Sequence, residues 1–310
     1  MIDIDLVYLW VDGSDPEWIG RRNAFIGRNM AQQGNCKGRY ADNGELRYSL
    51  RSVEEYAPWV RRIYIVTDRQ VPSWLNTTNP KIRIVDHKEI LPPEALPCFN
   101  SVVLEHHLHL IPELSEHFLY ANDDTFINRN VSHSDFFGED GLPIIRLNRR
   151  YMRKYYSLLK MNLLGMKRNI YSTTIHNAAL LVEKRFGKYY SSRTHHNIDA
   201  YLKSNYRMAR ELFAKEIDAT LCNHVRSTSD IQRNLYAYVA LATKCAHPIY
   251  VGKNTSLRFG IHRRSKYVYL EKYNPMLFCL NDSEYSTDDD RRYAIEYLSR
   301  RFPSKSHFEM

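Results

Sequence analysis

The chain of 310 residues lacks several features that would place it in a particular class of protein. No apolar run approaches the ~20 residues of a transmembrane helix. The N-terminus, MIDIDLVYLWVDG, has no basic segment followed by an apolar run, the pattern of a signal peptide. Internal repeats and low-complexity segments are also absent. We therefore expect a globular protein of the cytoplasm.

Cysteine is scarce and scattered. The five cysteines are an odd number, and no two of them form a CxxC pair. We interpret them as ordinary core thiols in a reducing cytosol, which argues against a disulfide framework and against a zinc site. They are Cys36, Cys98, Cys222, Cys245 and Cys279.

The composition is otherwise typical of a globular protein. Apolar residues make up 44% of the chain and charged residues 25%, which excludes a disordered or fibrous chain. Lysine and arginine total 44 against 35 acidic residues, a formal net charge of +9. This excess indicates an anionic partner, and a phosphorylated substrate, a nucleic acid and an acidic membrane surface all fit.

Short apolar runs alternate with helical patterns through the first half of the chain. Buried strands are predicted at 4–11, 62–67, 81–85 and 117–121, and helices at 44–56 and 100–111. Because strand, helix and strand alternate, we expect an α/β fold in which a mostly parallel sheet has helices on both faces. This predicted core spans residues 1–145.

The sequence changes in character near residue 146. Residues 146–172 are basic and rich in Tyr, Met and Asn. Helical patterns follow near 178–190, 197–215 and 229–245, then a β-leaning stretch at 247–280 and a last helix at 287–301. We predict that residues 146–310 form a mostly helical lobe that completes the active site, so that both parts make one interlocked catalytic unit.

Two turns that follow apolar stretches carry adjacent amide and carboxylate side chains. Asn122-Asp123-Asp124 follows the strand at 117–121, and Asn281-Asp282 ends another apolar stretch. Ligands of open α/β sheets bind at the carboxyl ends of strands, and oxygen ligands suit Mg²⁺ or Mn²⁺. We expect Asp123, Asp124, Asn281 and Asp282 to share one cation, and the alternative is a solvated turn at each place.

Polar residues of two other segments are candidates for binding a substrate. Asp12 ends the first strand, where nucleotide-binding sheets hold the base or ribose, although a capped turn also fits. Asp42 and Asn43 precede a helix on which Arg47 and Arg51 share a face at i, i+4 spacing. Two guanidiniums on one face repel each other unless an anion lies between them or carboxylates flank them, and an exposed basic face is the alternative.

The helix predicted at 100–111 begins with polar residues and contains three histidines. Asn100 and Ser101 stand at its start, where Ser101 and Glu105 nearly form a capping pair. His106, His107 and His109 follow without an HExxH pattern, which makes a soft-metal site improbable. We expect one of these histidines to face the cleft and the others to face solvent.

Three residues of the second half are further candidates. His176 stands before an apolar helix, where a histidine is more often structural than catalytic. Arg226 and Asp230 are spaced i, i+4, which also fits a weak helix salt bridge.

Taken together, these segments resemble the Stealth family of hexose-1-phosphate transferases. That family includes bacterial capsule polymerases and the animal lysosomal-enzyme N-acetylglucosamine-1-phosphotransferase. Its four regions appear here in order, as IDLVYLWVDGSDPEW at 4–18, a long second region from Asp42 to Phe126, IHNAALLVEKRFGKYY with HVRSTSDIQ, and FCLNDSE around Asn281. Where the family has a proline two residues after the histidine of the third region, this chain has Ala178.

The resemblance implies a fold and a reaction. The fold is a GT-A-like, Rossmann-like core that binds a nucleotide-diphosphate sugar, UDP-linked and for example a UDP-N-acetylhexosamine. The reaction is attack on the β-phosphorus, so that sugar-1-phosphate passes to a glycan hydroxyl as a phosphodiester and nucleoside monophosphate is released. The implied setting is the synthesis of capsule or other cell-surface polysaccharide.

The resemblance also implies roles for the candidate residues. Asp123, Asp124, Asn281 and Asp282 would hold Mg²⁺, and Arg226 and Arg47 would bind phosphate oxygens. His176 would act as the general base, with Asp230 orienting Arg226 or a histidine. Asp12, Asp42 and Asn43 would lie near the nucleotide and sugar, and Asn100, Ser101, Glu105 and His109 would line the cleft.

Two alternative functions stay open. A metal-dependent GT-A glycosyltransferase would use the same donor and release nucleoside diphosphate. A nucleic-acid-binding protein would explain the basic, aromatic residues 146–171, although no recognised nucleic-acid signature is present. The main interpretation expects a nucleotide sugar and an oligo- or polysaccharide acceptor as partners and no nucleic acid. A lipid-linked acceptor, peripheral contact with the inner face of a bacterial membrane and homodimerisation stay open.

Overall fold

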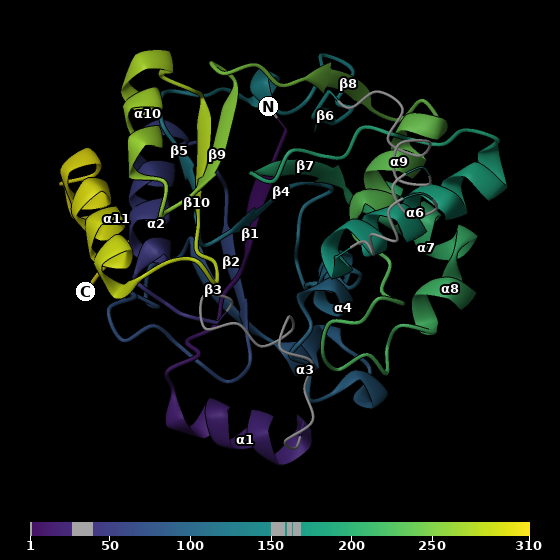
Figure 1. Cartoon of the computed structure of the whole chain (residues 1–310), viewed down its shortest axis with the longest axis horizontal. Coiled ribbons are helices and arrows are strands. Elements are labelled where there is room, and N and C mark those ends of the chain that lie inside the picture. The colour runs from purple at the N-terminus through teal and green to yellow at the C-terminus, as the bar shows by residue number, and fades with distance from the viewer. Residues whose placement is uncertain (1, 27–39, 150–158, 160–162, 164–168) are drawn as a thin grey trace.

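The computed structural model describes residues 2–26, 40–149, 159, 163 and 169–310. A five-stranded sheet in the order β3-β2-β1-β4-β7 lies at its centre (Figure 1). β1, β2, β3 and β4 are parallel, and β7 is antiparallel to β4. The strands are β1 (Ile4–Leu9), β2 (Ile63–Thr67), β3 (Ile82–Asp86), β4 (His117–Asn122) and β7 (Asp199–Leu202). The predicted α/β fold with a mostly parallel sheet is confirmed.

Two smaller sheets join strands that are distant in the sequence. One has the order β5 (Thr125–Ile127), β10 (Leu277–Asn281) and β9 (Ser256–Gly260). The other pairs β6 (Ile144–Leu147) with β8 (His247–Tyr250). Because β7, β8 and β10 all pair with strands of the first half, the two halves interlock. The residue at which they divide into domains stays a prediction.

The helices surround these sheets (Figure 1). They are α1 (Pro16–Ile26), α2 (Glu45–Tyr56), α3 (His87–Ile90), α4 (Ser101–Glu105), α6 (Ile170–Phe186), α7 (Lys203–Leu212), α8 (Ala214–Asp218), α9 (Asn234–Ala242), α10 (Val268–Tyr273) and α11 (Asp288–Arg301). Within the described ranges, no helix combines the length and the apolar character needed to cross a bilayer.

The predicted helices at 44–56 and 287–301 are confirmed as α2 and α11. The prediction for 197–215 is wrong at its start, because residues 199–202 form β7, whose four side chains are all buried against neighbouring elements. The four described cysteines are free thiols. Cys98 and Cys279 are buried, as predicted, but the prediction of core thiols is wrong for Cys222, which is exposed, and for Cys245, which is half-buried. Cys36 and most of the basic stretch 146–172 lie outside the described residues.

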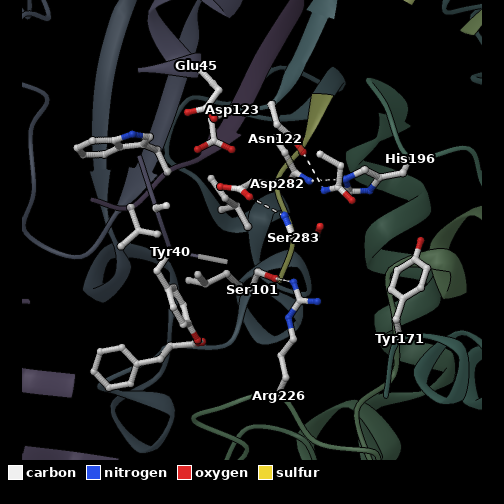
Figure 2. A pocket seen from close by; sticks show the side chains of 18 of the residues that line it. Tyr40, Glu45, Ser101, Asn122, Asp123, Tyr171, His196, Arg226, Asp282 and Ser283 are labelled. Carbon is white, nitrogen blue, oxygen red and sulfur yellow. Dashed lines mark hydrogen bonds between the residues drawn. The ribbon is translucent and has the colours of Figure 1, made fainter. Parts of the chain in front are cut away.

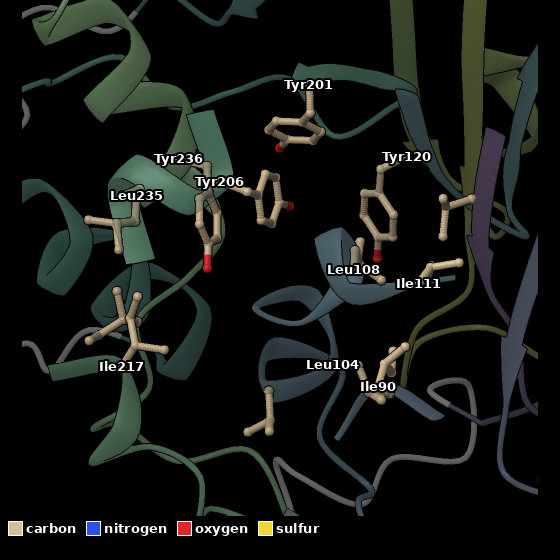
Figure 3. Close-up of a cluster of buried hydrophobic side chains, with 14 of the residues drawn as sticks. Ile90, Leu104, Leu108, Ile111, Tyr120, Tyr201, Tyr206, Ile217, Leu235 and Tyr236 are labelled. Carbon is tan, nitrogen blue, oxygen red and sulfur yellow. The ribbon is translucent and has the colours of Figure 1, made fainter. Parts of the chain in front are cut away.

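Successive side chains along the strands of the central sheet pack into two hydrophobic cores, one on each face of the sheet. On β1, Leu6 and Tyr8 pack into the core covered by α2, whereas Val7 packs into the core on the opposite face. That second core lies against α4, α6, α7 and α9. Figure 3 shows its tyrosine cluster, in which the rings of Tyr206 and Tyr236 stack with centroids 3.7 Å apart. The sheet is therefore buried on both faces, as parallel sheets generally are.

A charged group lies at the edge of the second core. The Arg233 guanidinium, 3% exposed, donates to Glu105 Oε1 at 3.2 Å and to Asp199 Oδ2 at 2.9 Å. It also sits over the Tyr120 ring, 4.8 Å from the centroid. Both carboxylates are almost fully buried, and buried carboxylates stay ionised at low cost only while a cation pairs with them. Arg233 therefore holds together β4, β7 and the start of α9.

We expect Arg233→Met to lower the free energy of unfolding by about 3–5 kcal/mol, because it leaves two buried carboxylates unpaired. Urea denaturation at pH 7 measures this loss. Arg292→Met is the matched control, since Arg292 makes an exposed pair with Asp289 and should cost no more than about 1 kcal/mol. A loss of that same small size in Arg233→Met would contradict the structural role of the buried cation.

Candidate active site

A cavity of about 560 Å³ opens at the carboxyl ends of the parallel strands. Its lining includes residues that follow β1, β2, β4 and β10, together with the start of α6. Among them are Leu9, Trp10, Val11, Asp68, Asn122, Asp123, Asp124, Tyr171, Asn281 and Asp282. Parallel strands end at the same edge of a sheet, so a cavity there collects side chains from segments far apart in the sequence.

The two predicted turns converge in this cavity. Asn281 Nδ2 donates to Asp124 Oδ2 at 3.2 Å. The backbone N–H of Leu280 donates to the carbonyl oxygen of Asp124 at 3.0 Å, because β10 pairs with β5 immediately after the turn. Asp123 and Asp282 also line the cavity (Figure 2). The expected meeting of the two turns is confirmed, and their binding of a cation stays a prediction.

Carboxylates crowd one end of the cavity. Burial, and then the charges of Asp124, Glu45 and Asp42, raise the pKa of Asp123 well above its usual value. Burial also raises the pKa of Glu45 to about 7, against hydrogen bonds from Asn43 that lower it. Figure 2 shows the carboxylates of Asp123 and Glu45 side by side. Protonation of a carboxylate or a bound cation relieves such crowding.

The donor atoms at this end fit a divalent cation that prefers oxygen. Asp124 Oδ1 is buried and has no hydrogen-bond partner in the described chain, so it is an open acceptor in a place where acceptors are normally satisfied. Asp282 is less open, because its carboxylate accepts from Arg291 Nε at 2.8 Å and Arg291 Nη2 at 3.2 Å. Asp124 and Asp123, with the Asn281 amide, are therefore the better ligand candidates.

A softer set of donors lies beside Asp124. Ligand atoms of Asp124, His196 and Cys279 are all within 4.8 Å of one another. The Cys279 thiol donates to Asp124 Oδ2 at 3.4 Å, and burial together with the charge of Asp124 raises the pKa of this thiol. A protonated thiol is a poor ligand for a hard cation, so the oxygen donors suit Mg²⁺ or Mn²⁺ better than the sulfur does.

Two arginines supply positive charge to the cavity. Arg226 Nη2 donates to Ser101 Oγ at 2.7 Å, and both residues line the cavity as predicted (Figure 2). Arg258, on β9, also lines it and donates from Nη2 to Asn281 Oδ1 at 2.8 Å. Arginine binds phosphate oxygens through paired N–H donors, so the cavity offers both carboxylates and phosphate-binding groups.

A chain of polar contacts links the buried ion pair to His196. Tyr120 Oη lies 3.1 Å from Glu105 Oε1 and donates to Asn122 Oδ1 at 2.9 Å. Asn122 Nδ2 in turn donates to His196 Nε2 at 3.1 Å. The Asn122 amide therefore connects Tyr120 to His196.

Burial and the charges of Arg258 and Arg233 lower the pKa of His196 well below its usual value. The imidazole is therefore neutral near pH 7. Sequence reasoning did not select His196, since its context, THHN, matches no motif. It did not select Arg258 either, which sits in an ordinary strand sequence, SLRFG.

Aromatic side chains form another wall of the cavity. The Trp18 ring packs against those of Tyr40 and Phe99, with centroids 5.1 and 5.5 Å apart. Gly13 holds Tyr40 in place, because its N–H donates to the Tyr40 carbonyl at 2.7 Å. A Cβ at Gly13 would lie 2.2 Å from that oxygen, so no other residue fits there. The turn after β1 thus positions a stacking surface.

Several predicted residues surround the cavity without lining it. Asp12 Oδ1 accepts from Ser14 N at 2.8 Å and shapes the turn after β1. Asp42 Oδ1 accepts from Gly44 N at 2.8 Å, and burial raises the pKa of Asp42. Asn43 Nδ2 donates to Glu45 Oε1 at 2.7 Å and reaches Asp282 Oδ2 at 3.5 Å. Of the three, Asn43 supports carboxylates that line the cavity.

Other predicted residues hold the structure beneath the cavity. Asn100 caps α4 through Val102 N at 3.1 Å, and its amide donates to Asp230 Oδ2 at 3.0 Å. Asp230 also accepts from Ser227 N at 2.8 Å and thereby shapes the loop that carries Arg226. Glu105 belongs to the buried ion pair described above. His109 packs against Tyr206, and burial lowers its pKa to about 4. The prediction that one histidine of this segment faces the cleft and the others face solvent is wrong, because His106, His107 and His109 are all buried and none lines the cavity.

Two predicted catalytic residues lie elsewhere. Arg47 points to the C-terminal segment, where its Nε lies 3.6 Å from Glu309 Oε2 and its guanidinium sits 5.0 Å from the Trp74 ring centroid. His176 lies on α6, whose first residues line the cavity, and its Nδ1 is 2.7 Å from Tyr189 Oη. Neither side chain is among those that line the cavity.

Comparison with known proteins identifies relatives of this chain. Residues 3–30 match the sequence model described as Stealth protein CR1, conserved region 1, and residues 39–145 match that of Stealth protein CR2, conserved region 2. The chain is 32% identical to the exopolysaccharide phosphotransferase cps2G of Lactiplantibacillus plantarum, over 99% of this chain and 96% of that protein. It is 33% identical to the capsular polysaccharide phosphotransferase WcwK of Streptococcus pneumoniae, over 100% and 98%.

Other relatives are longer. An exopolysaccharide phosphotransferase of Streptomyces coelicolor is 35% identical over 99% of this chain, which spans about half (52%) of that relative's length. Among solved structures, the galactosyltransferase LgtC with donor and acceptor sugar analogs aligns with a TM-score of 0.43 at 10% identity, over 97% of this chain and 96% of that one.

We expect Asp123→Asn to stabilise the protein in EDTA at pH 8. Because the folded-state pKa of Asp123 is raised, its ionisation opposes folding, and this cost grows as pH rises above the pKa of the unfolded state. The substitution should increase the free energy of unfolding by about 1 kcal/mol or more at pH 8, and the gain should shrink as the pH approaches 4. Urea denaturation at both pH values measures it, and destabilisation at pH 8 would contradict the charge crowding.

Proposed function

This chain belongs to the Stealth family, and from that premise we propose that it transfers sugar-1-phosphate from a nucleotide-diphosphate sugar to a glycan hydroxyl. The product is a phosphodiester, and nucleoside monophosphate leaves. The relatives' names support a phosphotransferase of capsular or exopolysaccharide synthesis. The observation that carries the proposal is the single cavity in which Asp124 and Asn281 meet beside Arg226 and Arg258.

The proposed reaction needs three things from the protein. The donor's β-phosphorus must lie in line with the attacking hydroxyl, the charge on its oxygens must be neutralised, and the hydroxyl proton must be accepted. The acceptor oxygen then forms a bond to the β-phosphorus as the bond to the oxygen bridging the two phosphates breaks. That oxygen leaves as part of the nucleoside monophosphate, and the acceptor's proton passes to the base.

We propose that Asp123, Asp124 and Asn281 hold Mg²⁺ or Mn²⁺, with Asp282 kept in place by Arg291. The cation, when bound, neutralises charge on the diphosphate. Arg226, oriented by Ser101 and by the loop that Asp230 shapes, donates to the phosphate oxygens. The wall made by Trp18, Tyr40 and Phe99 supplies ring faces for stacking a nucleobase or a sugar. A UDP-linked donor is proposed from the family resemblance.

We expect the protein to release nucleoside monophosphate when it is incubated with Mg²⁺, an acceptor glycan and a panel of UDP-linked sugars. Mass spectrometry of the released nucleotide and of the acceptor product measures the outcome, because phosphotransfer adds a sugar-phosphate to the acceptor. Asp124→Ala is the control and should abolish turnover at practical Mg²⁺ concentrations. Nucleoside diphosphate with a plain glycoside as the product would establish the alternative, a GT-A-type glycosyltransferase.

The general base is proposed to be His176, from the family pattern. It lies five residues after the cavity-lining Tyr171 on α6, a rise of about 7.5 Å along the helix. We expect His176→Ala to lower turnover by ~10²–10⁴-fold while nucleotide-sugar binding persists. Single-turnover rates and calorimetry measure the two quantities.

His196→Ala is the comparison for this assay, since His196 lines the cavity and burial lowers the pKa of its imidazole, which is neutral near pH 7. Near-normal turnover in His176→Ala, combined with a large loss in His196→Ala, would move the role of base to His196.

A further inference from the structure

Arg258 is hydrogen-bonded to an oxygen atom that the proposed cation site needs as a ligand. Its Nη2 donates to Asn281 Oδ1 at 2.8 Å, and the same amide donates through Nδ2 to Asp124 Oδ2 at 3.2 Å. The amide oxygen, which is the only side-chain atom of Asn281 able to ligate a hard cation, is therefore bound to a guanidinium. The Asn281 amide thus lies between the Asp124 carboxylate and the Arg258 guanidinium and is hydrogen-bonded to both.

The charge of Arg258 also acts on the carboxylate. It favours the ionised form of Asp124 and so partly offsets the rise in pKa that burial causes. In a cavity that crowds Asp123, Asp124 and Glu45 together, Arg258 is a counter-charge already in place. A divalent cation bound to Asp124 would lie close to this guanidinium, and two positive charges at that range repel each other.

Few contacts hold the Arg258 side chain. Its side chain is exposed in the cavity, and its contact with Asn281 is the only hydrogen bond it makes among the residues that the structure describes. Arg233, by contrast, is buried and fixed by two carboxylates. A guanidinium with most of its N–H groups uncommitted is suited to paired hydrogen bonds with phosphate oxygens.

We propose that Arg258 holds the ligand atoms of the cation site until cation and donor enter the cavity, and then becomes a phosphate-binding residue. Asn281 Oδ1 then exchanges the guanidinium for the cation, and Arg258 turns its N–H donors onto the diphosphate. This inference rests on the proposed function, because it assumes that Asp124 and Asn281 bind a cation and that the cavity binds a nucleotide diphosphate.

The variant Arg258→Gln tests the exchange, because the proposal expects its affinity for Mn²⁺ to rise and its affinity for UDP to fall. Without nucleotide, Mn²⁺ should bind about tenfold more tightly than to the wild type, because a competing positive charge is gone. With Mn²⁺ saturating, UDP should bind about tenfold more weakly, because a phosphate donor is lost. Electron paramagnetic resonance of free Mn²⁺ measures the first constant and calorimetry the second, and neither requires turnover.

Arg258→Lys and Arg292→Gln are the controls. Arg258→Lys keeps the charge and should return Mn²⁺ affinity close to the wild-type value, with UDP affinity between those of the wild type and Arg258→Gln. Arg292→Gln removes a surface charge and should change neither constant. Unchanged or weaker Mn²⁺ binding in Arg258→Gln overturns the exchange, and so does UDP affinity equal to that of the wild type.

Asp124→Asn separates this inference from the proposed function. If Asp124→Asn binds Mn²⁺ as tightly as the wild type, the cation site itself is wrongly placed, and the proposal for Arg258 fails with it. If Asp124→Asn loses Mn²⁺ but Arg258→Gln leaves both constants unchanged, the cation site stands and only the exchange is wrong.

Discussion

The site depends on holding carboxylates of like charge close together at the edge of a buried sheet. Three separate elements bring Asp123, Asp124 and Glu45 together. They are the β4–β5 turn, the start of α2, and the strand β10, which is hydrogen-bonded to the turn and pairs with β5. Burial and mutual repulsion both oppose this arrangement, as the raised pKa values of Asp123 and Glu45 show. The free energy that maintains it must therefore come from packing elsewhere, chiefly the two cores that cover the parallel sheet.

That packing also explains why the second half of the chain cannot be a separate lid. β7 completes the central sheet, and β10 pairs with β5 one residue after Asp124. The backbone bond from Leu280 to Asp124 and the side-chain bond from Asn281 come from the same strand. The position of Asp124 is thus set by residues more than 150 positions away in the sequence. Arg233, which joins Glu105 to Asp199, links the same two halves below the cavity.

The sequence predicted those features that depend on local pattern and on the geometry of parallel sheets. Asp124 and Asn281 could be paired in advance, since each follows an apolar stretch. The pairing of β10 with β5, which brings them together, joins a separate sheet that the sequence did not predict. Arg47 could not be placed, because its direction is decided by Glu309 and Trp74, which no local pattern connects to it. Residues 199–202 were predicted as helix because the pairing that makes them a strand lies on β4. His196 and Arg258 lack any motif and are recognised only by where the fold puts them.

The same residues show why charge alone does not identify the functional groups. Asp282 and Asp124 are both acidic and both line the cavity, yet Asp282 is satisfied by two bonds from Arg291, whereas Asp124 keeps a buried oxygen without a partner in the described chain. Arg233 and Arg258 differ in the same way, one fixed between two carboxylates and the other held by a single amide. In each pair the fully bonded member stabilises the fold. The incompletely bonded member has an atom left for a ligand, and this difference, rather than residue type, separates the candidate site from the structure that supports it.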